Sequence, residues 1–67
     1  MEREQTKSIL VNEREAAAIL GVALQTVRNW RGRRVGPSYV KYSSAVRYDL
    51  RDLQEYIRQH RIVLGEN

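Results

Sequence analysis

The sequence predicts a single small α+β domain, and three observations support this prediction. The chain has 67 residues and no cysteine, so one modest core without disulfides must hold it together. Two short helical patterns stand on either side of a glycine-containing turn. Two β-rich stretches and a third helical pattern follow them. This order predicts a small winged helix-turn-helix over residues 1–67, with a core at about 9–61 between flexible ends.

The first helix is expected to begin at Glu13. Asn12 and Glu15 have the spacing of a capping box, in which each side chain bonds the backbone N–H of the other residue. The alanine-rich run that follows favours helix, and Gly21 supplies a left-handed stop. A short strand over residues 8–10 is expected in front of this helix. On the first helix, Ala17 and Leu20 are expected to face inward, with Ala16 close by.

The second helix is expected over residues 24–31. Val27 and Trp30 stand three positions apart, so one stripe of this helix faces the core. Trp30 is interpreted as part of that core rather than as a side chain that stacks on a base. Gly32 is the expected stop. Ala23 stands at the N-cap, where alanine cannot bond free backbone N–H groups, and the missing cap costs about 1 kcal/mol.

A β-hairpin wing is expected to follow the second helix. Residues 38–42 and 45–48 are rich in β-branched and aromatic side chains, with a serine-containing turn between them. Strand alternation puts Val46 and Tyr48 on the core face of the hairpin and Arg47 on the other face. The sheet thus has one packed and one solvated side.

A third helix is expected after Asp49, whose side chain caps it and whose charge suits the positive helix end. Its apolar stripe is expected to contain Leu50, Leu53 and Ile57, with Tyr56 beside them. A short apolar segment follows, and it has two open interpretations: it packs back on the domain, or it contacts a neighbouring copy. Its residues are Ile62, Val63 and Leu64.

Positive charge is concentrated in the middle of the chain. Residues 1–23 contain three basic and four acidic side chains, for a net charge of −1. Residues 24–48 contain six basic side chains and no acidic one, and residues 49–67 again contain three basic and four acidic ones. An unbalanced basic block is typical of a surface that binds the phosphate backbone of nucleic acid. The alternative is a basic surface that is only solvated.

The outward face of the second helix is the candidate base-reading surface. Arginine can form two hydrogen bonds with guanine, and glutamine or asparagine can do the same with adenine. Gln25, Arg28 and Asn29 are therefore expected to contact base edges. Thr26 and Arg31 are expected to contact the DNA backbone. The wing residues expected to contact phosphates or an adjacent minor groove are Arg33, Arg34, Lys41, Ser43, Ser44 and Arg47.

Catalytic, metal and membrane functions are not expected. One histidine and no cysteine cannot supply a zinc site, and neither Ser43 nor Ser44 has an evident base beside it. No run approaches the about 20 apolar residues that span a bilayer, and the first residues lack the apolar stretch of a signal peptide. The sequence therefore predicts no catalytic residue, no cofactor, no membrane partner and a cytoplasmic location.

One set of motifs carries a family resemblance: Glu15-Ala16-Ala17, Leu20-Gly21-Val22, Thr26-Val27, Trp30, Gly36-Pro37, Val46-Arg47-Tyr48 and Asp52-Leu53. With these residues the sequence resembles the small excisionase-type and AlpA-type proteins, which have a MerR-like winged helix. The resemblance covers about residues 10–61, and members of this family commonly have Ser or Thr where this chain has Ala23. It implies double-stranded DNA as the partner. It also implies either a factor that helps an integrase excise a phage or mobile element, or a small transcriptional regulator.

The leading hypothesis is a sequence-specific, non-catalytic DNA-binding protein of excisionase type. One small module with about 5–8 phosphate contacts binds weakly and with steep salt dependence. Self-association on adjacent sites, or a tyrosine or serine recombinase as partner, is expected to add affinity. Small wedges with inserted wings also bend DNA. The alternatives are a transcriptional regulator with the same DNA-binding face and a protein-interaction module whose arginines dock an acidic partner.

Overall fold

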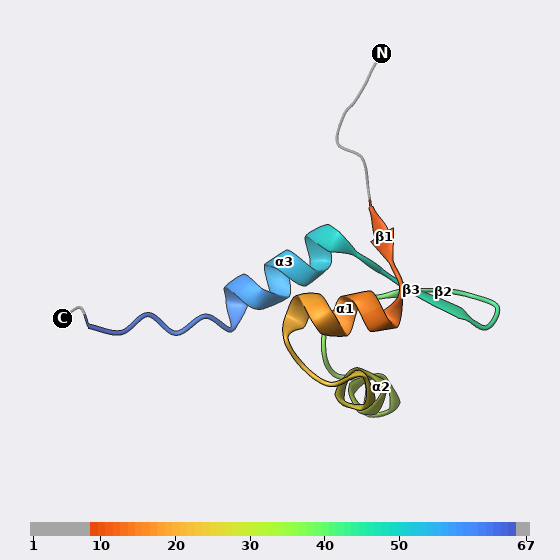
Figure 1. The fold of residues 1–67 in the computed structure, drawn as a ribbon, viewed down its shortest axis with the longest axis horizontal. Coiled ribbons are helices and arrows are strands. Elements are labelled where there is room, and N and C mark those ends of the chain that lie inside the picture. Colours follow the sequence, from red (N-terminus) through yellow and green to blue (C-terminus); the bar gives the residue numbers. More distant parts are fainter. Residues whose placement is uncertain (1–8, 66–67) are drawn as a thin grey trace, which may run out of the picture.

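Three helices and a small antiparallel sheet make up residues 9–65, the part of the chain that this computed structural model describes (Figure 1). The helix-turn-helix pair is followed by the hairpin and then by the third helix, so the predicted winged helix-turn-helix is confirmed. The elements in chain order are β1 (Leu10–Val11), α1 (Glu13–Leu20), α2 (Leu24–Gly32), β2 (Val40–Tyr42), β3 (Ala45–Asp49) and α3 (Leu50–Gln59).

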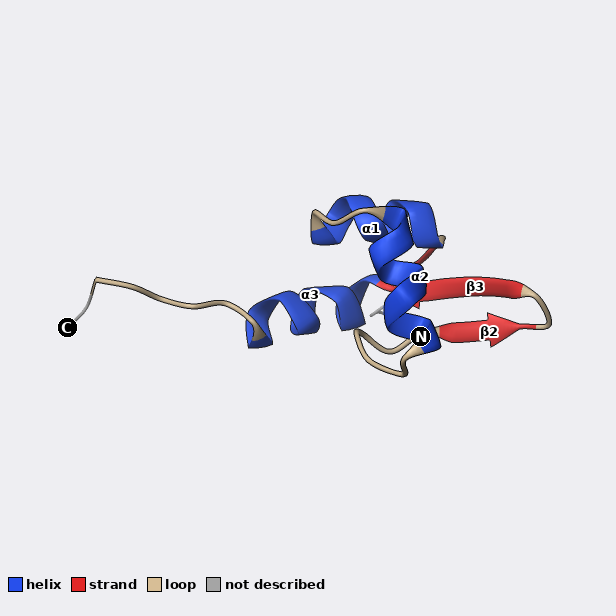
Figure 2. Ribbon diagram, turned by 90° about the horizontal axis from the view of Figure 1, so that it is seen from below, coloured by secondary structure: helices blue, strands red, loops and turns tan. Residues whose placement is uncertain are grey.

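β3 is the central strand, and β1 and β2 pair with it antiparallel on its two sides. β2 and β3 project from the helices as the wing, and its two-residue turn begins at Ser43 (Figure 2). The expected strand at residues 8–10 is wrong in its bounds, because β1 is formed by the two residues that lie opposite Asp49 and Tyr48. Ser8 lies outside the described residues.

The core is small and joins α1, α2, β3 and α3. Val46 and Tyr48 share its side of the wing, as the alternation predicts, and the partly buried Leu20 and Leu50 pack against it. Two of its members are alanines, whose small side chains let the helices approach closely. The buried hydrophobic residues that form the core, none more than 4% exposed, are Ala16, Ala17, Val27, Tyr48 and Leu53.

Two predicted core residues lie outside this cluster. Trp30 is half-buried, because it stands about 60° around α2 from Val27 and so lies at the edge of the buried stripe. Its ring packs on Tyr56, with centroids 5.8 Å apart, and under Gly36, where a Cβ would lie 3.0 Å from Trp30 Cε3. Ile57 is 37% exposed, because the end of α3 extends beyond α1 (Figures 1 and 2).

The start of α1 follows the sequence prediction closely. Asn12 Oδ1 accepts the N–H of Glu15 at 2.8 Å, and Glu15 Oε1 accepts the N–H of Asn12 at 2.9 Å, which completes the capping box. Gly21 ends the helix in left-handed backbone at φ 74. Ala23 makes no side-chain hydrogen bond at the N-cap of α2, and Asp49 caps α3 by accepting the N–H of Arg51. Local capping signals therefore fix three of the helix ends.

The end of α2 differs from the prediction. Gly32 is the last helical residue rather than the stop, and the left-handed residue is Arg34, at φ 59. The N–H of Val35 then donates to the carbonyl of Trp30 at 2.9 Å, which closes the helix. A residue with a Cβ is strained in this conformation. The helix therefore ends on a residue type that does not signal the end in the sequence.

Replacing Arg34 by glycine is expected to raise the free energy of unfolding by about 0.5–1 kcal/mol. Glycine relieves the left-handed strain, and the greater freedom of glycine in the unfolded chain offsets part of this gain. Urea denaturation measures the change. Ser43 also has left-handed backbone, at φ 55 in the turn of the wing, so Ser43→Gly is the matched variant. Its free energy of unfolding is expected to rise as well. Lower stability in both variants would contradict this account of the strain.

Candidate nucleic-acid interface

α2 presents one polar stripe to solvent. Gln25, Arg28 and Asn29 are exposed on it, Thr26 is half-buried beside it, and Val27 is fully buried on the opposite side. Gln25 Nε2 donates to Asn29 Oδ1 at 2.9 Å. The other amide atoms of this pair, one carbonyl oxygen and one NH₂ group, are an acceptor and a donor. The three predicted base-reading residues thus lie on one face, and their contact with bases stays a prediction.

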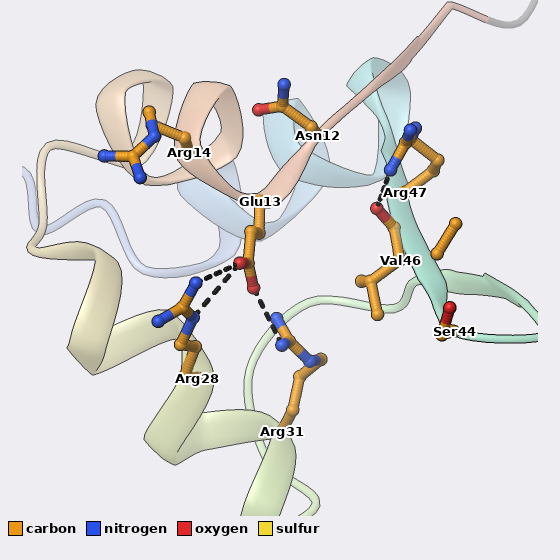
Figure 3. A pocket seen from close by; sticks show the side chains of 9 residues that line it. Asn12, Glu13, Arg14, Arg28, Arg31, Ser44, Val46 and Arg47 are labelled. Atoms are coloured by element: carbon orange, nitrogen blue, oxygen red, sulfur yellow. Dashed lines mark hydrogen bonds and ion pairs between the residues drawn. The ribbon is translucent and has the colours of Figure 1, made fainter.

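Glu13, in the first turn of α1, binds two arginines of α2 (Figure 3). Its Oε2 accepts from Arg28 Nη2 at 2.6 Å and from Arg28 Nε at 3.1 Å. Its Oε1 accepts from Arg31 Nη2 at 2.8 Å. These hydrogen bonds, with Arg28 first and Arg31 second, lower the pKa of Glu13 from 4.5 to about 2. The carboxylate therefore ties the two helices together and orients Arg28.

Sequence reasoning missed Glu13 as a residue of this surface. It belongs to the mixed-sign segment at residues 1–23, apart from the basic block, and the capping pattern accounts for its position without any partner. Its partners stand 15 and 18 residues later in the chain. Only the packing of α1 against α2 brings them together, and the sequence contains no local signal for that pairing.

Arg31 lies on the flank of α2 between the helix and the sheet. Its side chain is 19% exposed, and its Nη1 donates to Tyr48 Oη at 3.2 Å. Its guanidinium lies 5.8 Å from the centroid of the Tyr39 ring. The prediction that Arg31 faces outward is wrong, because its helical position falls beside buried Val27 and because Glu13 supplies a countercharge there. Arg31 joins α1, α2 and β3.

A polar hollow of about 450 Å³ lies between α1, α2 and β3 (Figure 3). Arg28 and Arg31 point into it toward Glu13, and Arg47 folds back so that its Nη1 donates to the carbonyl of Val46 at 2.7 Å. Four arginines and one carboxylate leave this hollow strongly positive, which is the electrostatic environment that attracts a phosphate. Its lining residues are Asn12, Glu13, Arg14, Arg28, Arg31, Ser44, Ala45, Val46 and Arg47.

The other predicted contact residues occupy two further places. Lys41 on β2 and Ser43 at the tip of the wing are both exposed. Arg33 and Arg34 are exposed in the turn after α2, so their assignment to the wing is wrong. The reason is that seven residues, 33–39, separate α2 from the first strand of the wing. Basic side chains therefore extend from the wing past the hollow to the end of α2.

The free energy of unfolding is expected to fall in acid as Glu13 becomes protonated. Its folded-state pKa of about 2 lies below the ordinary value of 4.5, so its stabilisation is present above pH 4.5 and is lost as the pH falls toward 2. Glu13→Gln is expected to cost about 1–2 kcal/mol at neutral pH, because partly buried Arg31 loses a charged partner. Urea denaturation at several pH values measures both effects.

Glu55→Gln is the matched control for this prediction. Glu55 is also held in a pair with an arginine, Arg58, which lowers its pKa, but the pair is exposed on α3. An exposed pair of this kind contributes little to the free energy of unfolding, because solvent screens it. An unchanged acid dependence in Glu13→Gln, or equal destabilisation in both variants, would show that the Glu13 cluster does not stabilise the fold.

The described part of the chain, residues 9–65, contains no group of three or more potential metal-ligating side chains and no helix long and apolar enough to cross a membrane. Comparison with curated proteins gives no match. A family model described as a helix-turn-helix domain matches residues 10–61, which is most of the chain and includes every helix and strand of the fold. The chain therefore belongs to the helix-turn-helix domain family and is a small DNA-binding protein.

Proposed function

We propose that α2 enters the major groove of duplex DNA and reads base edges there, while the wing lies on the backbone or the adjacent minor groove. The observation that carries this proposal is the exposed polar stripe of α2 beside an arginine-lined hollow. An α-helix about 10–12 Å wide fits the major groove of B-DNA, which is about 12 Å wide. The stripe supplies the guanidinium and amide groups that such readout uses.

Arg28 is the side chain that we assign to guanine. Glu13 Oε2 occupies the Nε side of its guanidinium, which leaves the Nη1–Nη2 end for O6 and N7 of a guanine. The fixed orientation removes rotamer freedom before binding, so less entropy is lost on contact with the base. We assign Gln25 and Asn29 to adenine, since their outer amide atoms supply the acceptor and donor that N6 and N7 require.

The remaining basic and hydroxyl side chains are assigned to the DNA backbone. Such contacts fix the register of the protein without reading sequence. With about 5–8 phosphate contacts, the logarithm of the binding constant is expected to fall with the logarithm of salt concentration at a slope of about −5 to −7. The residues are Thr26, Arg33, Arg34, Lys41, Ser43, Ser44 and Arg47, together with Arg14 at the hollow, whereas Arg31 is held by Glu13 and Tyr48.

We infer that the biological role is of excisionase type. Copies of the protein bind DNA cooperatively and bend it, which promotes excision of a phage or mobile element by a tyrosine or serine recombinase. Two observations support this role: the resemblance over about residues 10–61 and the small size of the domain, which limits its own affinity and favours neighbouring copies. A wing inserted beside each recognition helix deforms the duplex at each site.

A bending assay on a native attachment site tests this role. Duplexes of equal length carry the site at different distances from their ends, and a bend slows migration most when the site is central. The proposal expects bending that increases as further copies bind. Unbent DNA with ordinary occupancy would favour the regulator instead, and the absence of salt-sensitive DNA binding would favour the protein-interaction module.

A further inference from the structure

An apolar cavity of about 320 Å³ opens beside the C-terminal half of α3, and this end of α3 lies away from the wing (Figure 1). The ends of α1, α2 and α3 surround it. Three rings tilted against one another build one wall, with the centroids of Trp30 and Tyr56 5.8 Å apart and those of Tyr56 and His60 4.2 Å apart. Its volume is within the range of about 300–1,000 Å³ that binding pockets have. The lining residues are Leu20, Trp30, Tyr56, Ile57, His60 and Arg61.

An exposed apolar segment begins at the rim of this cavity. Arg61 lines the cavity, and the next residues, Ile62, Val63 and Leu64, are 80%, 75% and 81% exposed. The segment extends away from the helices beyond the end of α3 (Figures 1 and 2). The interpretation that it packs back on its own domain is therefore wrong for this structure. One molecule carries both an open apolar cavity and an exposed apolar segment, and burial of either surface is favourable.

The segment is badly placed to fill the cavity of its own chain. A reverse turn uses four residues, and a turn that starts at Arg61 would consume the three apolar residues themselves. The glycine with left-handed backbone in this region, Gly65 at φ 84, comes only after them. A second copy of the chain presents the same segment to the cavity without any such turn.

We propose that two copies of this chain exchange their 62–64 segments, each occupying the apolar cavity of the other about a two-fold axis. The cavity and the segment lie at the same end of the molecule, and a two-fold axis is the symmetry that joins such surfaces in two equal contacts. The two extended segments run antiparallel, so Leu64 of one copy lies beside Ile62 of the other copy. Each cavity opens at the start of its own segment, so Leu64 of one copy reaches the cavity of the other. Three extended residues span about 10 Å, and alternation puts Ile62 and Leu64 on one side.

This exchange leaves the DNA-binding face free. Trp30 and Arg31 lie on opposite flanks of the buried stripe of α2, so the apolar cavity and the arginine-lined hollow open on different sides of the helix. Three apolar residues from each copy bury far less than the about 1,600 Å² of a standard interface, so the free dimer is expected to be weak. Adjacent DNA sites raise the effective concentration of the partners. The use of the dimer on DNA rests on the proposed function, but the contact itself does not.

The two-fold axis also predicts the arrangement of the DNA sites. Two copies related by this axis are expected to occupy half-sites in inverted orientation, because the symmetry of the protein pair is mirrored in the site. The pair is then the cooperative unit that loads onto DNA.

Trp30 gives a direct readout of the exchange, because it lines the cavity and is the single tryptophan of the chain. As the full chain is concentrated from about 1 µM to about 1 mM, its emission is expected to shift to shorter wavelength while its sedimentation mass rises toward two copies. Leu64→Asp is expected to weaken both changes by about tenfold or more, because a charge would have to enter the apolar cavity. Val63→Asp adds the same charge on the other side of the extended segment and is expected to have a much smaller effect.

A mixing experiment separates exchange from every other kind of association. Leu64→Asp spoils the segment, and Ile57→Asp spoils the cavity at a position that is already 37% exposed, so both chains should fold. Each variant alone is expected to stay monomeric, whereas their mixture regains one of the two contacts and forms a mixed dimer. The proposal is overturned by a wild type that stays monomeric with constant Trp30 emission. It is equally overturned by association that Leu64→Asp leaves intact, or by a mixture that associates no better than its components.

Binding of all these variants to a duplex with one half-site keeps the two proposals distinct. Their affinity is expected to equal that of the wild type, because the cavity and the exchanged segment lie away from the exposed polar stripe of α2. If the wild type does not bind DNA at all, the proposed function is contradicted. The exchange is measured without DNA, so that outcome leaves the test of the exchange unaffected.

Discussion

Arg28→Ala is expected to weaken binding to the specific DNA site by about 10–100-fold, because one bidentate base contact contributes about 1–3 kcal/mol to discrimination. The affinity is expected to fall more than when an ordinary surface charge is removed, because Glu13 also loses its hydrogen-bond partner Arg28. Fluorescence anisotropy with a labelled duplex at fixed salt measures the affinity. Binding to unrelated duplexes is expected to fall much less.

Arg58→Ala is the matched control. Arg58 is likewise an exposed arginine paired with a carboxylate, that of Glu55, but it lies on α3. Its removal changes the net charge by the same amount and is expected to change the affinity by less than about twofold, since it is not on the binding face. Equal weakening by Arg28→Ala and Arg58→Ala would mean that net charge, and not readout by α2, supplies the binding.

Leu53→Ala is expected to lower the free energy of unfolding by about 2–5 kcal/mol. Leu53 is 0% exposed and connects α3 to a core cluster in which two of the five buried hydrophobic residues are alanine. A domain of 67 residues has a total stability of about 3–10 kcal/mol, so this one change removes a large part of it. Urea denaturation followed by circular dichroism measures the loss.

Ile57→Ala, one turn later on α3, removes the same number of carbons from a position that is 37% exposed. It is expected to cost about 1 kcal/mol or less, because little apolar surface returns to water and no closed cavity forms. If the two variants lose equal amounts of unfolding free energy, Leu53 is not the residue that contributes most to the packing of α3 on the core.

The elements of this fold could be predicted because their signals are local. Asn12 and Glu15 stand three residues apart, Gly21 adopts the left-handed backbone that its type favours, and Asp49 caps the helix that follows it. The burial of Val27 could be predicted as well, because helical spacing turns its side chain toward the other elements. Each of these outcomes depends on a few neighbouring residues.

The structure differs from the sequence predictions where the environment of a side chain depends on packing between segments that are distant in the sequence. Trp30 and Ile57 have core-like side chains and spacing, but their burial depends on whether another element reaches over them. Arg31 belongs to the basic block, yet Glu13 holds it against the sheet. Arg34 ends α2 because the chain must turn there, although its residue type disfavours the required backbone.

Selection of binding sites from a pool of random duplexes tests the reading of DNA by α2 most directly. The wild type is expected to enrich one motif, and Arg28→Ala is expected to lose the preference for guanine at one position of it. Asn29→Ala is expected to relax the preference for adenine at a different position. No enriched motif, or one motif that both variants select unchanged, would contradict the assignment of base recognition to the exposed stripe of α2.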